Sequence, residues 1–206
     1  MAAKKKTPAA AGATLYPVLP IIKPTDLTGQ QNGYLTANIL RTIQKPSGQL
    51  EKHAATAWNC LQLAAYFNGL TLNQVGAYRT YNQQLAMFND RYSIKDYGRK
   101  PQVIRIWQGR KYYLKPGKAP SSTPGNSDHG LGLAIDAANC YEGSALLAWL
   151  LGDGFATSQA LLYGFTWAVA DPKNPNFEPW HLQYVTGDTW TQYVLEALKV
   201  FPALEA

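Results

Sequence analysis

The chain has 206 residues, of which 46% are apolar and 16% are charged, and its net charge is +6. This apolar content can form one good hydrophobic core, but the length leaves little material for a second full domain. Two cysteines, Cys60 and Cys140, are too few for a disulfide framework, and we expect both to be small buried side chains.

Three of the positive charges lie together at residues 4–6, so the rest of the chain carries +3. A basic surface can attract nucleic acid, anionic lipid or the anionic polymers of a bacterial envelope, and charge alone does not rank these partners. Because no predicted helix has a basic face with interleaved aromatic residues, we do not expect a nucleic-acid partner. We also expect no membrane span, and synthesis in the cytoplasm without a signal peptide.

The first half of the chain is predicted to begin with a tail and then to alternate helices and strands. Residues 1–25 are rich in Ala, Lys and Pro and are expected to form a flexible basic tail, with a single domain over residues 26–206. Apolar residues at helical spacing predict a helix over residues 50–67, ended by Asn68-Gly69. A strand over 72–80 and a helix over 82–92 follow.

The second half is predicted to begin with a hairpin. Its strands are residues 103–107 and 111–114, joined by a turn at Gln108-Gly109, and an irregular loop over 116–126 follows. Further strands are expected over 133–136 and 181–185, and helices over 144–162 and 189–200. Together, these elements predict an α+β fold with a small, mostly antiparallel sheet and helices packed around it.

Two of the three histidines stand close to acids in the sequence. His129 precedes Asp136 by seven residues, and His181 follows Glu178 by three. Two imidazoles and one carboxylate make a three-ligand set for one catalytic zinc ion, with the fourth position left for water. We therefore predict that His129, Asp136 and His181 bind zinc, and that Glu178 is the general base when zinc-bound water attacks.

The same residues belong to a specific pattern. The segment SDHGLGLAID at residues 127–136 resembles the SxHxxGxAxD signature of the VanY-like D-alanyl-D-alanine carboxypeptidases, and EPWH at 178–181 is similar to their ExWH motif. These enzymes belong to the wider group of lysostaphin, D-Ala-D-Ala metallopeptidases and sonic hedgehog. The resemblance implies a zinc site in a cleft on the sheet, with the same ligands and the same base.

A third block, GAYRTYNQQ at residues 76–84, resembles the family's GYRSYxxQ segment. It implies that Arg79 acts in catalysis, either on a substrate carboxylate or on the oxyanion of the transition state. Gln84 and Ser127 are implied to form hydrogen bonds to substrate, and Trp180 to line the pocket. The resemblance covers about residues 32–185.

The function implied is hydrolysis of peptidoglycan stem peptides by a monomeric enzyme. The segment from 103 into the His129 motif looks most like peptidases of phages, which predicts a role in cell-wall lysis after release through holin pores. Three alternatives stay open: an endopeptidase, a D-Ala-D-Ala carboxypeptidase of wall metabolism, and a non-catalytic zinc-bearing module of the hedgehog type. The presence of both Glu178 and Arg79 argues against the last of these.

Overall fold

The computed structural model describes residues 15–44, 46–174 and 176–205. The fold is mixed α+β with antiparallel sheets, as predicted, but the strands form three separate small sheets rather than one. No helix in these ranges is long and apolar enough to cross a membrane. Both cysteines are buried and free, as expected.

The central sheet has four strands in the order β3-β7-β9-β8, all antiparallel. The strands are β3 (Gln74–Gly76), β7 (Ala134–Ala137), β9 (His181–Tyr184) and β8 (Phe165–Trp167). In their register, Asp136 is paired with Gly76 on one side and with His181 on the other. The sheet therefore brings together positions separated by more than 100 residues in the chain.

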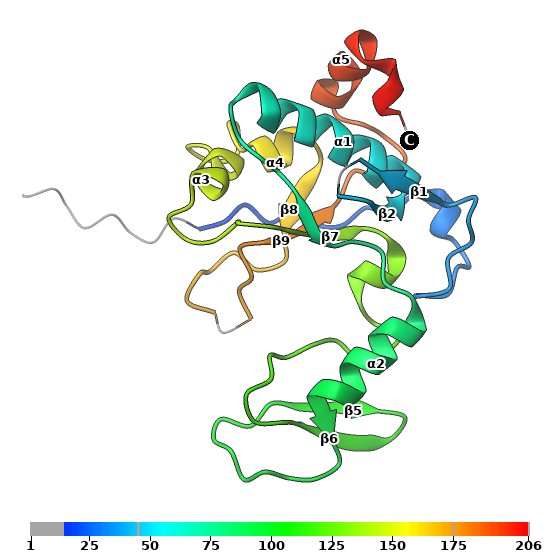
Figure 1. Cartoon of the computed structure of the whole chain (residues 1–206), viewed down its shortest axis with the longest axis vertical. Coiled ribbons are helices and arrows are strands. Elements are labelled where there is room, and N and C mark those ends of the chain that lie inside the picture. Colours follow the sequence, from blue (N-terminus) through cyan, green and yellow to red (C-terminus); the bar gives the residue numbers. More distant parts are fainter. Residues whose placement is uncertain (1–14, 45, 175, 206) are drawn as a thin grey trace, which may run out of the picture.

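The longest helix, α1 (Lys52–Phe67), lies across the central sheet in Figure 1. Its Trp58 is fully buried and packs edge-on against Phe165 of β8. The helix follows directly on a hairpin of β1 (Leu40–Ile43) and β2 (Gly48–Glu51) that the sequence did not predict. As a result, α1 begins two residues later than expected, and Glu51 caps it by accepting hydrogen bonds from two backbone amides.

A second helix, α2 (Tyr81–Arg91), leads away from the body to a small lobe, shown below it in Figure 1. This lobe is a sheet in the order β4-β6-β5, formed by β4 (Tyr92–Ser93), β6 (Arg110–Leu114) and β5 (Ile104–Trp107). The predicted hairpin is confirmed in β5 and β6, and Gln108 and Gly109 have the positive φ angles that its tight turn requires.

The remaining helices are short. They are α3 (Ala145–Leu151), α4 (Gln159–Leu162), α5 (Gln192–Val200) and the 3-10 turns η1 (Thr25–Leu27), η2 (Asp128–Leu131) and η3 (Pro202–Leu204). Of these, α5 and η3 pack against α1. The prediction of a single helix over 144–162 is wrong, because two helices lie in this range. Gly152 ends α3 with a positive φ, and Ser158 starts α4 by capping the amide of Leu161.

The predicted boundary of the N-terminal tail is also wrong. Residues 1–14 lie outside the described residues, but Tyr16 is only 5% exposed and packs edge-on against Trp167 and Phe177. The hydroxyl of Thr166 in β8 bonds the carbonyl of Pro17 and the amide of Leu19. The segment from Tyr16 onward is therefore part of the folded domain, ten residues earlier than the expected start at residue 26.

Candidate metal centre

The predicted metal ligands come from three adjoining elements. His129 lies in η2, which ends at Gly132 with a left-handed φ of 67° and so turns the chain into β7. Asp136 lies in β7 and His181 begins β9, where the two residues are paired across the sheet. One donor atom from each of the three residues lies within 4.8 Å of the other two.

The distances from Asp136 to the two histidines are close to those between the ligands of a tetrahedral ion. One oxygen of Asp136 lies 3.3 Å from Nε2 of His129, and the other lies 2.9 Å from Nδ1 of His181. Zinc bonds of about 2.0–2.2 Å separate neighbouring tetrahedral ligands by roughly 3.4 Å, so little movement is needed. Nδ1 of His129 lies 2.9 Å from the carbonyl of Ala77, which fixes the ring with Nε2 facing Asp136.

The ionised form of Asp136 and the protonated form of His181 stabilise each other. Burial raises the pKa of Asp136, but the hydrogen bonds and charges of His129 and His181 outweigh it, and the net pKa lies well below the usual range. Burial lowers the pKa of His181, but the hydrogen bond and charge of Asp136 reverse this and leave its pKa raised. Asp136 is therefore ionised near neutral pH, as a metal-binding carboxylate must be.

Gly76 makes room for the Asp136 carboxylate, a role that its motif did not reveal. A Cβ atom at Gly76 would lie 2.7 Å from Oδ2 of Asp136, closer than such atoms approach in proteins. We therefore expect Gly76→Ala to displace the carboxylate and to weaken metal binding by about 10- to 100-fold, the usual cost of disturbing the surroundings of a metal ligand. Competition with a zinc chelator would measure this.

The matched control is Val75→Ala, one residue away in the same strand, where the side chain is 73% exposed. This change should leave metal affinity within twofold of the parent. Unchanged affinity in Gly76→Ala would show that the carboxylate can shift at no cost, and that the close approach of Gly76 has no role in metal binding.

Arg79 follows β3 and is near both acids of the site. Its backbone amide donates to the carbonyl of His129 at 3.0 Å. Burial lowers the pKa of its guanidinium, while the negative charges of Asp136 and Glu178 raise it, so the group lies within electrostatic reach of both. Arginine remains charged under these conditions.

Gln84 fixes Arg79 in place. Its side chain is 2% exposed; Oε1 accepts from Nη1 of Arg79 at 2.8 Å, and Nε2 donates to the carbonyl of Ser122 at 2.7 Å. Both ends of the amide are occupied by protein groups. The contacts support a positioning role for Gln84 rather than the substrate contact expected from the sequence.

Glu178 and Trp180 lie in a turn that enters β9. The amide of His181 donates to the carbonyl of Glu178 at 3.0 Å, with Pro179 in the second position of the turn, where its fixed φ is favourable. Both side chains are exposed, Trp180 by 39%. The negative charge of Glu178 contributes to the raised pKa of His181. A base role for Glu178 and a pocket wall at Trp180 remain predictions consistent with this placement.

Ser127 immediately precedes η2 and is buried. Its carbonyl accepts hydrogen bonds from the Asn32 side chain at 2.7 Å and from the Gly130 amide at 2.8 Å. Gly130 packs so closely on Asn32 that a Cβ atom there would overlap the amide. These contacts hold the loop that carries His129, and substrate binding by Ser127 remains a prediction.

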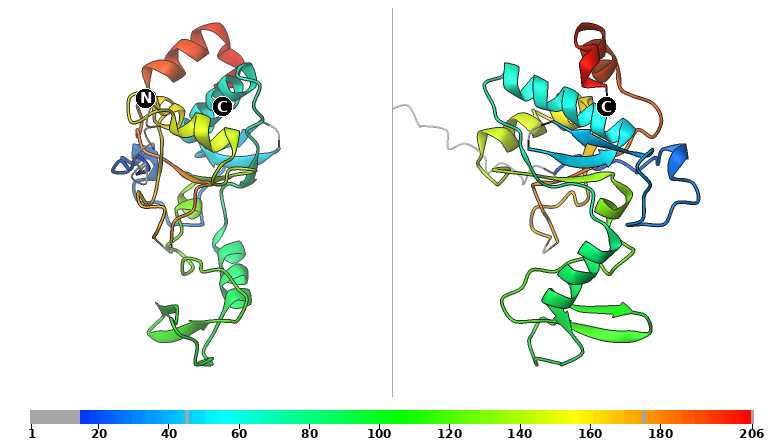
Figure 2. Two further views of the ribbon diagram at one scale, coloured as in Figure 1. Left: turned by 90° about the vertical axis from the view of Figure 1, so that its left-hand side faces the viewer. Right: turned by 45° about the vertical axis from the view of Figure 1, so that its right-hand side comes forward.

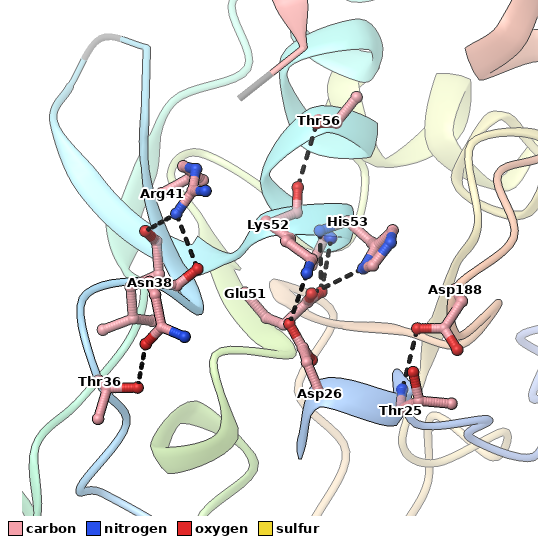
Figure 3. A network of polar contacts seen from close by, with 12 residues as sticks. Thr25, Asp26, Thr36, Asn38, Arg41, Glu51, Lys52, His53, Thr56 and Asp188 are labelled. Carbon is pink, nitrogen blue, oxygen red and sulfur yellow. Dashed lines mark hydrogen bonds and ion pairs between the residues drawn. The ribbon is translucent and has the colours of Figure 1, made fainter. Parts of the chain in front are cut away.

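A second group of possible metal ligands, formed by Asp26, Glu51 and His53, is drawn in Figure 3. Here the carboxylates already have protein partners. Nζ of Lys52 lies 3.1 Å from Asp26, and Glu51 accepts from the backbone amides of His53 and Ala54 and contacts the ring of His53 at 2.8 Å. The group is therefore explained as the cap of α1.

The comparisons with known proteins agree with the fold. A set of two histidines and one aspartate is typical of catalytic rather than structural zinc sites. Residues 47–187, more than half of the chain, match the family described as VanY: D-alanyl-D-alanine carboxypeptidase. The chain belongs to this family.

One curated relative is the protein named "Putative carboxypeptidase YodJ" of Bacillus subtilis (strain 168), 28% identical over 145 residues. The match covers 66% of this chain but 46% of the relative, so the chain spans about half the length of the protein it matches.

Two solved structures have similar folds, each with a TM-score of 0.50. VanYB in complex with D-alanine-D-alanine is 18% identical, with coverage of 89% of this chain and 91% of that one. A variant of the vancomycin-resistance D,D-pentapeptidase VanY in complex with Zn(II) is 19% identical, with coverage of 92% of each chain. At 18% and 19% identity, the similarity to these two structures shows a similar fold and nothing more.

Proposed function

We propose that the chain is a zinc-dependent peptidase that hydrolyses peptide bonds in the stem peptides of peptidoglycan. The observation that carries this proposal is the convergence of donor atoms from His129, Asp136 and His181 beside the charges of Arg79 and Glu178. Family membership supports it, as do the zinc and the D-alanine-D-alanine bound by the two neighbours of similar fold.

Zinc held by the three ligands would supply a Lewis acid that makes water nucleophilic near neutral pH. Asp136 keeps two imidazoles oriented by contacting one nitrogen of each. Glu178, exposed at the edge of the site, would accept the proton of the attacking water and later deliver it to the leaving amine. It is the first residue of a turn that contains Pro179, so its backbone is held in place before substrate arrives.

Arg79 would bind negative charge on the substrate carboxylate or on the oxyanion. Replacement with lysine keeps the charge but loses the planar group that makes two parallel hydrogen bonds. We expect Arg79→Lys to lower kcat/KM by about 10- to 100-fold, on the basis of about 1.5–3 kcal/mol for hydrogen bonds to charged groups. A rise in KM alone would assign Arg79 to the carboxylate, and a fall in kcat would assign it to the oxyanion.

Arg91→Lys is the matched control for that experiment. Arg91 ends α2 and donates to the carbonyl of Pro120, outside the metal centre; its charge contributes to the lowered pKa of Arg79, and lysine keeps that charge. Its kinetic constants should match those of the parent. If both parameters of Arg79→Lys also stay within twofold of the parent, Arg79 has no catalytic role.

Two candidate activities differ in which peptide bond of the wall they cut. The family favours removal of a terminal D-alanine, whereas the sequence resemblance to phage peptidases favours an endopeptidase that lyses the wall. Mass spectrometry of purified peptidoglycan digested by the protein tests both. Free D-alanine with intact cross-links identifies a carboxypeptidase, and new internal termini with falling turbidity identify an endopeptidase of the lytic type. Absence of any peptide cleavage with zinc present would contradict the proposal.

A further inference from the structure

The positive charge of the chain is concentrated in one segment. Residues 92–118, here called the basic lobe, contain eight Lys and Arg residues and one acid, which gives a net charge of +7. Since the whole chain carries +6, all other residues together carry −1. The cations are Lys95, Arg99, Lys100, Arg105, Arg110, Lys111, Lys115 and Lys118.

The basic lobe is the part of the molecule that projects beyond α2 in Figures 1 and 2. Six of its cations are exposed; they come from the loop between β4 and β5, the start of β6 and the loop after β6. Within the described part of the chain, Lys118, bound to Asp90, is the one cation of the lobe in an ion pair. The other charges are not neutralised by carboxylates and can bind an anionic partner.

We propose that the basic lobe binds a flexible, phosphodiester-linked polyol polymer of the bacterial wall. Such a polymer carries one negative charge per repeat and can follow cations spread over two loops and a strand end. Binding would release counterions and would weaken steeply with salt. The inference rests on the proposed function only in placing the partner in the wall, beside the peptides that would be cut.

The aromatic side chains of the lobe favour this partner over nucleic acid. Trp107 and Tyr112 are partly buried and pack edge-on against the buried Phe88, with ring centroids 5.5 and 5.1 Å away. Rings held against Phe88 in this way are fixed by the fold and leave less surface for stacking on unpaired bases. The exposed cations lie in loops and at strand ends, so no helix presents them to a groove of a duplex.

The apolar surface of the lobe is small. Its exposed large apolar side chains are three isoleucines. Ile94, in the loop after β4, is 67% exposed; Ile104 and Ile106, on the outer face of the hairpin, are 39% and 70% exposed and are paired with Tyr113 and Lys111. Three isoleucines offer far less apolar area than the continuous face of a membrane-bound amphipathic helix. Charge is therefore the main property available for recognition.

The basic lobe is joined to the candidate metal centre by one short helix. Gln84, which binds Arg79, and Phe88, which lies in the core of the lobe, are four residues apart in α2. The whole helix has 11 residues and is about 16 Å long at 1.5 Å per residue. A polymer bound to the lobe would hold the attached wall close to the site and raise the effective concentration of its peptides.

Two variants with the same net charge test the proposal. In the lobe variant, Lys95, Lys100 and Lys111 are changed to Gln; in the control, Lys23, Lys173 and Lys199, exposed positions outside the lobe, are changed to Gln. Binding of fluorescent poly(glycerol phosphate) is measured at 50 and 200 mM salt. We expect the lobe variant to bind about 10- to 100-fold more weakly at low salt with a flatter salt dependence, and the control to bind within threefold of the parent.

Equal weakening of both variants would overturn the proposal, because net charge alone would then explain binding. Tighter binding of single-stranded DNA, or binding of anionic vesicles that is lost when Ile104 and Ile106 are changed to Ser, would replace it with a different partner. The assay needs no hydrolysis and can use Glu178→Gln protein. Polymer binding without peptidase activity would therefore contradict the proposed function but not the role of the lobe.

Discussion

Replacing Glu178 with glutamine should lower kcat/KM for a soluble stem peptide by about 10²- to 10⁴-fold, the usual contribution of a general base. Glutamine keeps the size of the side chain but cannot accept a proton. Because the side chain is exposed and outside the core, the fold should be unaffected. Steady-state kinetics at matched zinc content, together with thermal unfolding of both proteins, measures the effect.

Asp128 is the rival carboxylate for this role, because its charge also acts on His181. It already accepts a hydrogen bond from Gln183 at 2.6 Å, which leaves it less free to take a proton. Asp128→Asn should therefore reduce activity much less than Glu178→Gln. A larger loss in the Asp128 variant, with near-normal turnover in the Glu178 variant, would move the base assignment to Asp128.

The parts of the site that could be predicted from sequence are those for which residue type and local spacing are sufficient. A histidine and an aspartate seven residues apart, joined by glycines, predict a turn and a strand, and the structure has η2 followed by β7. Likewise Glu178, Pro179 and His181 predict a bend entering a strand, and the structure has a turn before β9. Most strand ends differed by one or two residues, but the strand predicted over 72–80 is only β3 (Gln74–Gly76), because pairing with neighbouring strands determines where a strand stops.

Other features depend on contacts between distant segments, which local patterns do not contain. Tyr16 is buried because Trp167 and Phe177, more than 150 residues later, form its pocket, and its own neighbours have no helical or strand periodicity. Gly76 is required by a carboxylate 60 residues away. The concentration of charge in residues 92–118 is visible in the sequence, but its presentation on a projecting lobe is not.

Replacing His181 with alanine should remove most of the bound zinc and all measurable peptidase activity. The change deletes one of three protein ligands and leaves a carboxylate and a single imidazole, which hold zinc weakly. Disturbing groups around a zinc ligand already costs 10- to 100-fold in affinity, so loss of the ligand itself should cost more than about 100-fold. Metal analysis after dialysis against a weak chelator measures the stoichiometry, and we expect about one zinc in the parent and almost none in the variant.

His53→Gln is the matched control, because His53 is the third histidine of the chain and belongs to the other group of possible ligands. Glutamine can keep a hydrogen bond to Glu51, so the cap of α1 should be preserved. This variant should retain both zinc and activity. If His53→Gln lost the metal while His181→Ala retained it, the ion would be bound by Asp26, Glu51 and His53. The three residues on η2, β7 and β9 would then have no metal to hold, and Glu178 would have no role as a base beside it.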